Sequence, residues 1–572
     1  MKKISSPENF TLVFLAIITF ASAPFFVDTV MLPKFLVLNL YSIIILILIL
    51  NSFKNFFSLS KFLTLITVSF PIILFISTSK SNQNLHDSLF GIWGRYNGTL
   101  LYLCLPLLFI LGVLLYSSNF SRKIIDVLTM IGLCQLVIGG LELLNVDLFS
   151  YLNKDPYLKL SLGNSNFASI FLVMTFIATL INYLFYATRK LHRNVFMFSL
   201  ISHILLIVST RALQGLVALA VSAFLLFWYL ASIRLRKEFI DRNKFYFFPI
   251  FITLILSIYL IIELKIISLN SLFDRLYIWT AAFGMIKDNL LFGVGVDAFG
   301  KWFPLYKETE TLQYQVNFEN YDSAHNIFLN LGATLGLPAL ISYLSIVLFV
   351  FSRILATRKR FLNNPSIVGL ICIWIVFQIQ ALVSIDHIVL FVWGWLIGGV
   401  IVGYSYCCAA DSFTEVPVNS KQIKAPAIKS KLKVRSLIFL VILQATFISY
   451  AFPTIKGEIL IKKYSVNVKY ISEQKALGNI TPEVLELFKL TNAGIFEVCM
   501  SLRSEDLRNY GAVVLANSGE QELAIKLSLD TIYRFPRSIN ARFILVQIYE
   551  SKGEAELANQ YSREILVLDP LR

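Results

Sequence analysis

Long apolar runs separated by short polar segments are the feature that most limits how this 572-residue chain can fold. About thirteen runs approach the roughly 20-residue length that an α-helix needs to cross a bilayer. They cover about residues 10–27, 35–50, 61–78, 98–117, 124–144, 167–187, 194–210, 212–232, 245–264, 324–352, 365–385, 387–406 and 436–453. Because 57% of the residues are hydrophobic, most of this surface must face lipid. We predict an all-α, polytopic membrane helix bundle with about 12–13 spans.

The distribution of Lys and Arg among the loops predicts the orientation of the chain. If the N-terminus is cytoplasmic, the inside loops hold most of the basic residues, including Arg189, Lys190 and Arg193, whereas short outside loops hold one or two each. Such an excess marks loops that stay in the cytoplasm. We therefore expect the loop at 265–323 and the C-terminal tail on the outer side. The net charge of +15 then reflects topology rather than nucleic-acid binding.

Composition divides the chain into two domains. Residues 1–456 form the expected membrane domain, in which a polar, Lys-rich cytoplasmic linker at 409–435 precedes the last span, and residues 457–572 form a helical tail. In the tail, SGEQELAIKLS at 518–528 matches KGEAELANQYS 34 residues later. That period is similar to tetratricopeptide repeats. Two interpretations of the tail remain open, a partner-binding surface and a packing cap on the membrane domain.

The outer loop at 265–323 is too long for a simple connector. Apolar residues recur along its first half at alternating spacings of four and three, which predicts an amphipathic helix lying on an apolar surface and ended by Gly293 and Gly295. This stripe consists of Leu272, Leu276, Trp279, Phe283, Ile286 and Leu290. The segment 293–298 also fits the dinucleotide pattern G-x-G-x-x-A. It lacks the preceding strand that such a site needs, so we do not predict nucleotide binding.

His325 lies where this loop meets the next apolar run, in the stretch YDSAHNIFLN. Asp322 and Ser323 are good N-cap residues for a helix that begins near Ala324. A histidine in the first helical turn feels the positive end of the helix dipole, which favours a neutral imidazole that can accept a proton. The alternative is an interfacial histidine that only bonds a backbone carbonyl.

Two arginines fall at the same predicted boundary. Arg275 stands on the amphipathic segment, and Arg211 follows a span and precedes the next with almost no loop between them. A guanidinium at a membrane edge is costly unless it is paired, and no acidic residue adjoins Arg211, so a phosphate is a sensible partner. Each arginine could instead be a surface anchor.

Other candidate residues are less specific. Arg95 stands among aromatic residues in the outer loop at 79–97, which suits a sugar or a lipid head group, and Lys34 is another outer cation. Asn164 precedes a span and is expected to cap it. The six cysteines show no metal-ligand or disulfide spacing, and the sequence has no P-loop.

Taken together, these residues make the chain similar to the O-antigen ligase and O-antigen polymerase superfamily. The resemblance extends over most of residues 10–406. Its main stretches are STRAL at 209–213, DRLYIW at 274–279, LFGVGVDAF at 291–299, SAHNIFL at 323–329 and LGLP at 335–338. Members with tetratricopeptide tails are common, which agrees with the repeat in the tail.

The resemblance implies a glycosyltransferase in a bacterial cytoplasmic membrane. It would move a glycan from a polyprenyl-diphosphate carrier to lipid A core, a growing glycan or a protein, on the outer face and without metal, ATP or another cofactor. His325 takes the place of the essential histidine, and Arg211 and Arg275 match the arginines that hold the diphosphate. Arg95, Lys34 and Asn326 are then candidate substrate contacts, and the tail is a candidate site for a protein partner.

Two other functions remain open. A transporter of a small anion such as bicarbonate would need ionisable residues buried in the spans, where Glu142 and His203 are the main candidates. A non-catalytic scaffold would use the tail to recruit other envelope proteins.

Overall fold

The structure is a computed structural model that describes residues 7–81, 83–149, 157–232, 270–308, 321–361, 363–411 and 434–571. The described residues contain helices and no strands. The predicted span at 245–264 and most of the linker at 409–435 lie outside them.

Ten of the described helices are long and apolar enough to cross a membrane. They are α2 (Met31–Leu59), α3 (Lys61–Lys80), α6 (Ser118–Leu143), α7 (Ser165–Ile181) together with the π-helical turn η1 (Asn182–Tyr186) that continues it, α8 (Lys190–Ser209), α9 (Leu213–Ser232), α15 (Leu337–Phe361), α16 (Pro365–Val383), α17 (Ile388–Asp411) and α18 (Val434–Ala476). Two shorter apolar helices, α1 (Pro7–Phe20) and α5 (Thr99–Leu115), join them. This arrangement confirms the predicted multi-pass helical bundle.

Helix α17 forms the centre of the bundle. Its apolar span is buried along its whole length, and α5 packs closely against it. A Cβ atom at Gly399 would collide with the carbonyl oxygen of Phe109, and Gly399 also lies next to Gly112. Glycines at the crossing therefore let the two backbones approach, as is common between helices in membranes.

The predicted span at 324–352 is wrong as a single helix. It is divided into α14 (Ile327–Leu335) and α15 by Gly336, which has φ +86°. A Cβ atom there would lie 2.5 Å from the backbone of Leu291, and the N–H of Leu337 donates to the carbonyl of Leu290 at 2.8 Å. The break thus lets the segment predicted as the outer loop, for which this name is kept below, pack against the end of α14. The predicted span at 10–27 is also shorter, because α1 ends at Phe20.

The outer loop contains the predicted amphipathic helix, α11 (Asn270–Asp288), and a shorter helix, α12 (Phe299–Tyr306). The predicted stripe does not form one buried face, since Leu276 and Phe283 are 54% and 58% exposed. The buried residues are instead Ile278, Ala281, Ala282 and Met285, which pack with α12 and α14. The contact with these two helices selects this face, which spacing alone does not reveal.

The tail consists of five helices after α18. These are α19 (Pro482–Ser501), α20 (Glu505–Asn517), α21 (Gln521–Arg534), α22 (Ile539–Lys552) and α23 (Ala555–Leu568). The pairs α20/α21 and α22/α23 begin 34 residues apart, so the sequence repeat corresponds to two helical hairpins. Helix α18 runs continuously through residue 456 and connects the bundle to this tail.

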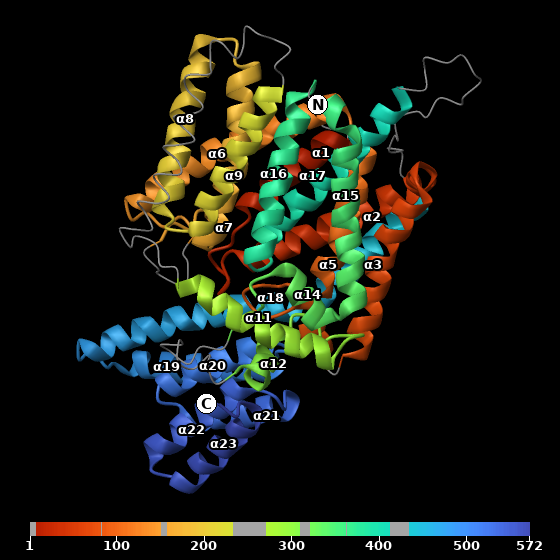
Figure 1. Cartoon of the computed structure of the whole chain (residues 1–572). Coiled ribbons are helices and arrows are strands. Elements are labelled where there is room, and N and C mark those ends of the chain that lie inside the picture. Colours follow the sequence, from red (N-terminus) through yellow and green to blue (C-terminus); the bar gives the residue numbers. More distant parts are fainter. Residues whose placement is uncertain are drawn as a thin grey trace.

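The outer loop and the tail meet at one end of the bundle (Figure 1). Figure 1 shows α11, α12 and α14 between the membrane helices and α19–α23, with the N-terminus at the opposite end. Ion pairs join the parts: Lys307 binds Asp569 at 2.7 Å, and Lys301 binds both Asp87 at 2.9 Å and Glu505 at 2.8 Å. The tail therefore packs against the same polar end on which the candidate site residues were predicted.

Candidate functional site

His325 lies immediately before α14 in a tightly held turn. Its φ of +47° lies in the left-handed region, which a non-glycine residue adopts only when its surroundings enforce it. The indole of Trp279 donates to the carbonyl of Ala324 at 3.0 Å, and the Ala324 N–H donates to Asn330 at 3.2 Å. The ring of Tyr321 meets the imidazole edge-on at 6.1 Å. These contacts place the half-buried imidazole in a defined orientation.

The predicted helix cap is wrong. Asn326, and neither Asp322 nor Ser323, caps α14: its side-chain oxygen accepts hydrogen bonds from the N–H groups of Phe328 and Leu329 at 3.0 and 3.1 Å. Asp322 instead forms an ion pair with Arg95. Helix α14 begins at Ile327 rather than near Ala324, so Asn326 occupies the N-cap position and Asp322 lies too far from the helix to cap it.

The surroundings of His325 keep its imidazole neutral. Burial lowers its pKa to about 4, and the positive charges of Arg95 and Arg275 act in the same direction, while Asp322 opposes them. Arg95 and Arg275 are therefore both close enough to act on the imidazole. The predicted place of His325 in the first helical turn is wrong, because His325 precedes the N-cap residue Asn326, and burial is the largest cause of the lowered pKa.

Arg95 is the centre of a charged cluster. One of its terminal nitrogens pairs with Asp322, while the other, Nη1, is buried and has no hydrogen-bond partner among the described residues. The guanidinium also interacts with the buried carboxyls of Asp297 and Asp386. Burial raises the pKa of each of these two carboxyls to about 7. Arg95 is thus surrounded by three carboxyl groups, and its Nη1 is still without a hydrogen-bond partner among the described residues.

The loop that carries Arg95 is fixed to both the outer loop and the tail. Asp297 accepts the Ile92 N–H at 2.7 Å, and Asp506 of the tail accepts the Trp93 N–H at 3.2 Å. Glu458 on α18 accepts from the Trp93 indole and, at 3.2 Å, from the hydroxyl of Tyr96. The tail therefore helps to position Arg95.

Beside Arg95 there is a cavity of about 370 Å³. Asp28, Lys159 and Asp386 contribute charged groups to its wall. The segment at 162–164 also lines it, where Asn164 caps α7 by accepting the Asn166 N–H, as predicted. The volume lies within the roughly 300–1,000 Å³ common for small-molecule sites.

The remaining predicted residues lie at different places. Arg211 occupies the turn between α8 and α9 with φ +55°, and its guanidinium lies 5.7 Å from the ring centroid of Tyr157. Among the described residues, the charges that act on His325 come from Arg95, Asp322 and Arg275, so His325 and Arg211 are not brought into one cluster.

Lys34 is fully buried and donates to the carbonyls of Thr19 and Ala21 at 3.2 and 2.7 Å. It thereby caps the C-terminal end of α1.

Sequence reasoning missed Asp297 and Asp386 as site residues. Asp297 belongs to the G-x-G-x-x-A segment, where it adopts φ +54°, and Asp386 accepts a hydrogen bond from the hydroxyl of Tyr102. Asp386 lies next to His387 in a short turn between two predicted spans, and a single aspartate in such a turn is only a weak indication of a functional site. Only the packing of distant loops shows that both carboxyls face Arg95.

The fold and this cluster define a multi-pass membrane protein with a charged site at the end of the bundle, covered in part by a helical tail. Residues 160–344 match the family model described as O-Antigen ligase, and this match supports the predicted resemblance to the O-antigen ligase and O-antigen polymerase superfamily. The match also supports a role as a membrane glycosyltransferase or ligase. No curated protein matches the chain. The matched segment includes Arg211, Arg275 and His325, whereas Arg95 and the tail lie outside it.

Proposed function

We propose that the protein transfers a glycan from a polyprenyl-diphosphate carrier to an acceptor hydroxyl at the outer face of the cytoplasmic membrane. The observation that carries this proposal is the neutral, rigidly held imidazole of His325 beside the guanidiniums of Arg95 and Arg275. A proton acceptor next to two permanent cations suits a reaction in which a hydroxyl attacks and an anion leaves.

In the proposed reaction, the acceptor oxygen attacks the anomeric carbon while the bond from that carbon to the diphosphate breaks. The hydroxyl proton passes to His325, and the polyprenyl diphosphate leaves with the bonding electron pair. Attack from the side opposite the leaving group inverts the configuration of the anomeric carbon. A lipid diphosphate needs charge stabilisation more than it needs a proton, and two guanidiniums can supply that.

The diphosphate would also adjust the basicity of His325. In the free protein, burial and two positive charges lower the pKa of His325 to about 4, which makes it a weak proton acceptor. A bound diphosphate neutralises Arg95 and Arg275 and therefore raises this pKa toward the working pH. Binding of the donor thus prepares the imidazole to accept the proton of the acceptor.

Within this proposal the arginines have different roles. Arg95 has a buried donor without a partner in the described residues, which suits a phosphate oxygen at the cavity of about 370 Å³. Arg211 lies by Tyr157, apart from the residues that act on His325. We infer that Arg211 contacts a more distant part of the donor, and that Arg95 and Arg275 hold the diphosphate.

The two ionisable residues that a transport function would use both have structural contacts. In α8, Nδ1 of His203 donates to the carbonyl of Ser199 at 2.8 Å, and Nε2 forms a hydrogen bond with the hydroxyl of Thr175 at 3.1 Å. Glu142 accepts the N–H groups of Lys159 and Leu160 at 2.8 and 2.9 Å. These contacts stabilise the bundle, and no observation favours transport over transfer.

The test is a deletion strain complemented with variants of the gene. Surface polysaccharides and glycoproteins are compared by gel electrophoresis and mass spectrometry. We expect one glycoconjugate to be lost or shortened in the deletion strain and in His325→Ala, and to be restored by the wild-type gene. His192→Ala is the matched control, because His192 is an exposed histidine at the start of α8. Normal glycoconjugates in a strain that makes only His325→Ala would exclude the proposed role of His325.

A further inference from the structure

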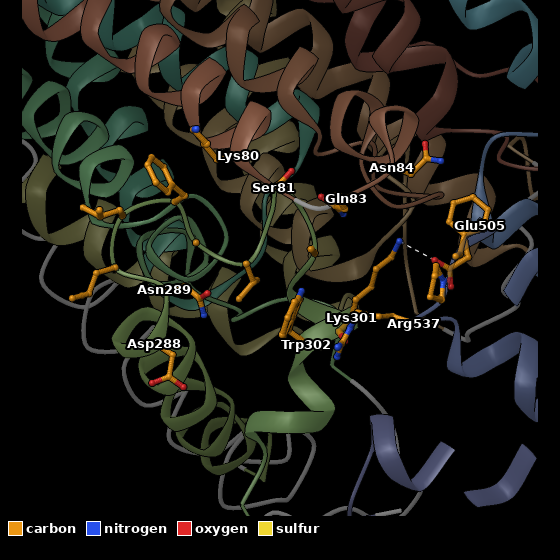
Figure 2. Close-up of a pocket in the computed structure, with 18 of the residues that line it drawn as sticks. Lys80, Ser81, Gln83, Asn84, Asp288, Asn289, Lys301, Trp302, Glu505 and Arg537 are labelled. Atoms are coloured by element: carbon orange, nitrogen blue, oxygen red, sulfur yellow. Dashed lines mark hydrogen bonds and ion pairs between the residues drawn. The ribbon is translucent and has the colours of Figure 1, made fainter. Parts of the chain in front are cut away.

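A second, larger cavity lies between the membrane domain and the tail. Its volume is about 680 Å³, and three separate parts of the chain form its walls (Figure 2). The segment after α3 contributes Gln83 and Asn84, the outer loop contributes Asn289 and Trp302, and the tail contributes Arg537. The cavity therefore exists only when the tail is packed against the bundle.

This cavity carries a net positive charge. Five of its lining residues are Lys or Arg and two are Asp or Glu. The charge of Lys301 is offset by ion pairs with Asp87 and Glu505. Lys80 and Lys287 are exposed and have no ion-pair partner among the residues that the structure describes. Two cations therefore remain available at the rim for an anionic ligand.

One wall combines an aromatic ring with a guanidinium. Arg537 lies over the indole of Trp302 at 4.1 Å, and its Nη2 donates to the carbonyl of Lys301 at 3.2 Å. Its Nε is buried and has no hydrogen-bond partner within the described part of the chain. Figure 2 shows Trp302 and Asn289 facing Gln83 across the cavity, with Lys301 and Arg537 on one side.

We propose that this cavity binds a negatively charged saccharide, and that this saccharide is the acceptor of the transfer reaction. Side-chain amides exchange hydrogen bonds with sugar hydroxyls, an indole provides an apolar surface for a sugar ring, and lysines at the rim attract carboxylate or phosphate groups. The volume is sufficient for a short oligosaccharide, since small-molecule sites span roughly 300–1,000 Å³.

The position of the cavity relative to Arg95 fits an acceptor. Ala298 lines the cavity, and the preceding residue, Asp297, interacts with Arg95. Gly300 lies against the backbone of Asp322, the partner of Arg95. A single segment, 297–301, therefore separates the saccharide cavity from the charged cluster. The role as acceptor rests on the proposed transfer reaction, whereas the binding itself does not.

The binding test uses the purified full-length protein in detergent. Isothermal titration calorimetry compares trigalacturonate, an acidic trisaccharide, with the neutral maltotriose. We expect saturable binding of trigalacturonate, several-fold tighter than maltotriose and weaker as salt is added. The double variant Lys80→Ala/Lys287→Ala should bind trigalacturonate about tenfold more weakly, since hydrogen bonds to charged groups contribute strongly. Both lysines are exposed, so their removal leaves the fold intact.

A double variant at two exposed tail lysines outside the cavity, Lys469→Ala/Lys489→Ala, is the matched control and should bind like the wild type. The proposed site is overturned if trigalacturonate shows no saturable binding, or if the two double variants bind it equally.

His325→Ala should bind trigalacturonate normally. If His325→Ala still transfers glycan, the proposed reaction fails but the saccharide site stands. If the Lys80/Lys287 variant binds weakly yet transfers at the wild-type rate, the acceptor assignment fails alone.

Discussion

Arg95 and Asp322 form an ion pair between two loops that are far apart in the sequence, and Asp322 lies three residues before His325. The pair joins the loop after α4 (Leu85–Phe90) to the turn that carries the imidazole. Arg95 lies outside the segment matched by the O-antigen ligase family model, so its role is inferred from the contacts in the structure. The guanidinium of Arg95 holds the turn of His325 through Asp322, and its buried Nη1 has no hydrogen-bond partner among the described residues. We therefore expect Arg95 both to position His325 and to bind the substrate.

We expect Arg95→Ala to reduce glycan transfer by about 100-fold, because a preorganised donor at the developing charge is lost. Arg95→Lys should cause a smaller loss, since it keeps the charge but not the forked geometry. Transfer is measured in membranes from the complemented deletion strain. Arg122→Ala removes another ion-paired arginine, near the start of α6, and should leave transfer unchanged. Equal activity of Arg95→Ala and Arg122→Ala would contradict the assigned role.

The pKa of His325 predicts the pH dependence of transfer. In the free protein this pKa is lowered to about 4, so the imidazole is neutral above that pH and becomes protonated as the pH falls through it. With respect to His325, kcat/KM should therefore be constant near neutral pH and decrease only in acid. The acid limb of kcat should lie at higher pH, because bound diphosphate raises the pKa. Coincident limbs for kcat and kcat/KM would argue against a diphosphate beside His325.

Glu458 connects the tail to the loop of Arg95, and its loss should affect both stability and activity. Its carboxylate accepts hydrogen bonds from the Asp28 N–H, the Trp93 indole and the Tyr96 hydroxyl. Glu458→Ala leaves these buried donors without an acceptor, at a cost of about 1–3 kcal/mol for each group. We expect a lower midpoint of thermal unfolding and faster proteolysis of the tail. Glu473→Ala, at an exposed site on the same helix, is the control and should unfold like the wild type.

Gly336 should not tolerate a side chain. Gly336→Ala introduces a Cβ into the left-handed region and against the backbone of Leu291, and we expect a loss of about 1–3 kcal/mol in stability. Gly140 in α6 has open space around its Cα, so Gly140→Ala should be neutral or slightly stabilising. Chemical denaturation of the two purified variants distinguishes them. A Gly336→Ala protein as stable as Gly140→Ala would mean that the break before α15 is not conformationally required.

The length of the apolar runs was sufficient to predict a multi-pass helical bundle, and the match between residues 518–528 and 552–562 was sufficient to predict a tail with a 34-residue repeat. Both depend on local patterns, because each span must satisfy its own backbone in lipid and each hairpin repeats its own contacts. The same local reasoning placed the cap at Asn164 correctly. It also singled out His325 at the junction of a loop and an apolar run, Arg275 on an amphipathic segment and Arg95 among aromatic residues of a loop.

The features that the sequence did not predict depend on contacts between segments that are far apart in the chain. The break at Gly336 exists because the outer loop crosses there, and the buried face of α11 is selected by α12 and α14. Lys34 looked like a free outer cation, yet the end of α1 folds over it and its ammonium bonds two carbonyls. Asp297 and Asp322 from the outer loop and Asp386 from the turn between α16 and α17 converge on Arg95. The spacing of residues along the chain does not predict that these carboxyl groups lie together. Their proximity depends on how the folded helices pack and on which charged groups this packing buries next to one another.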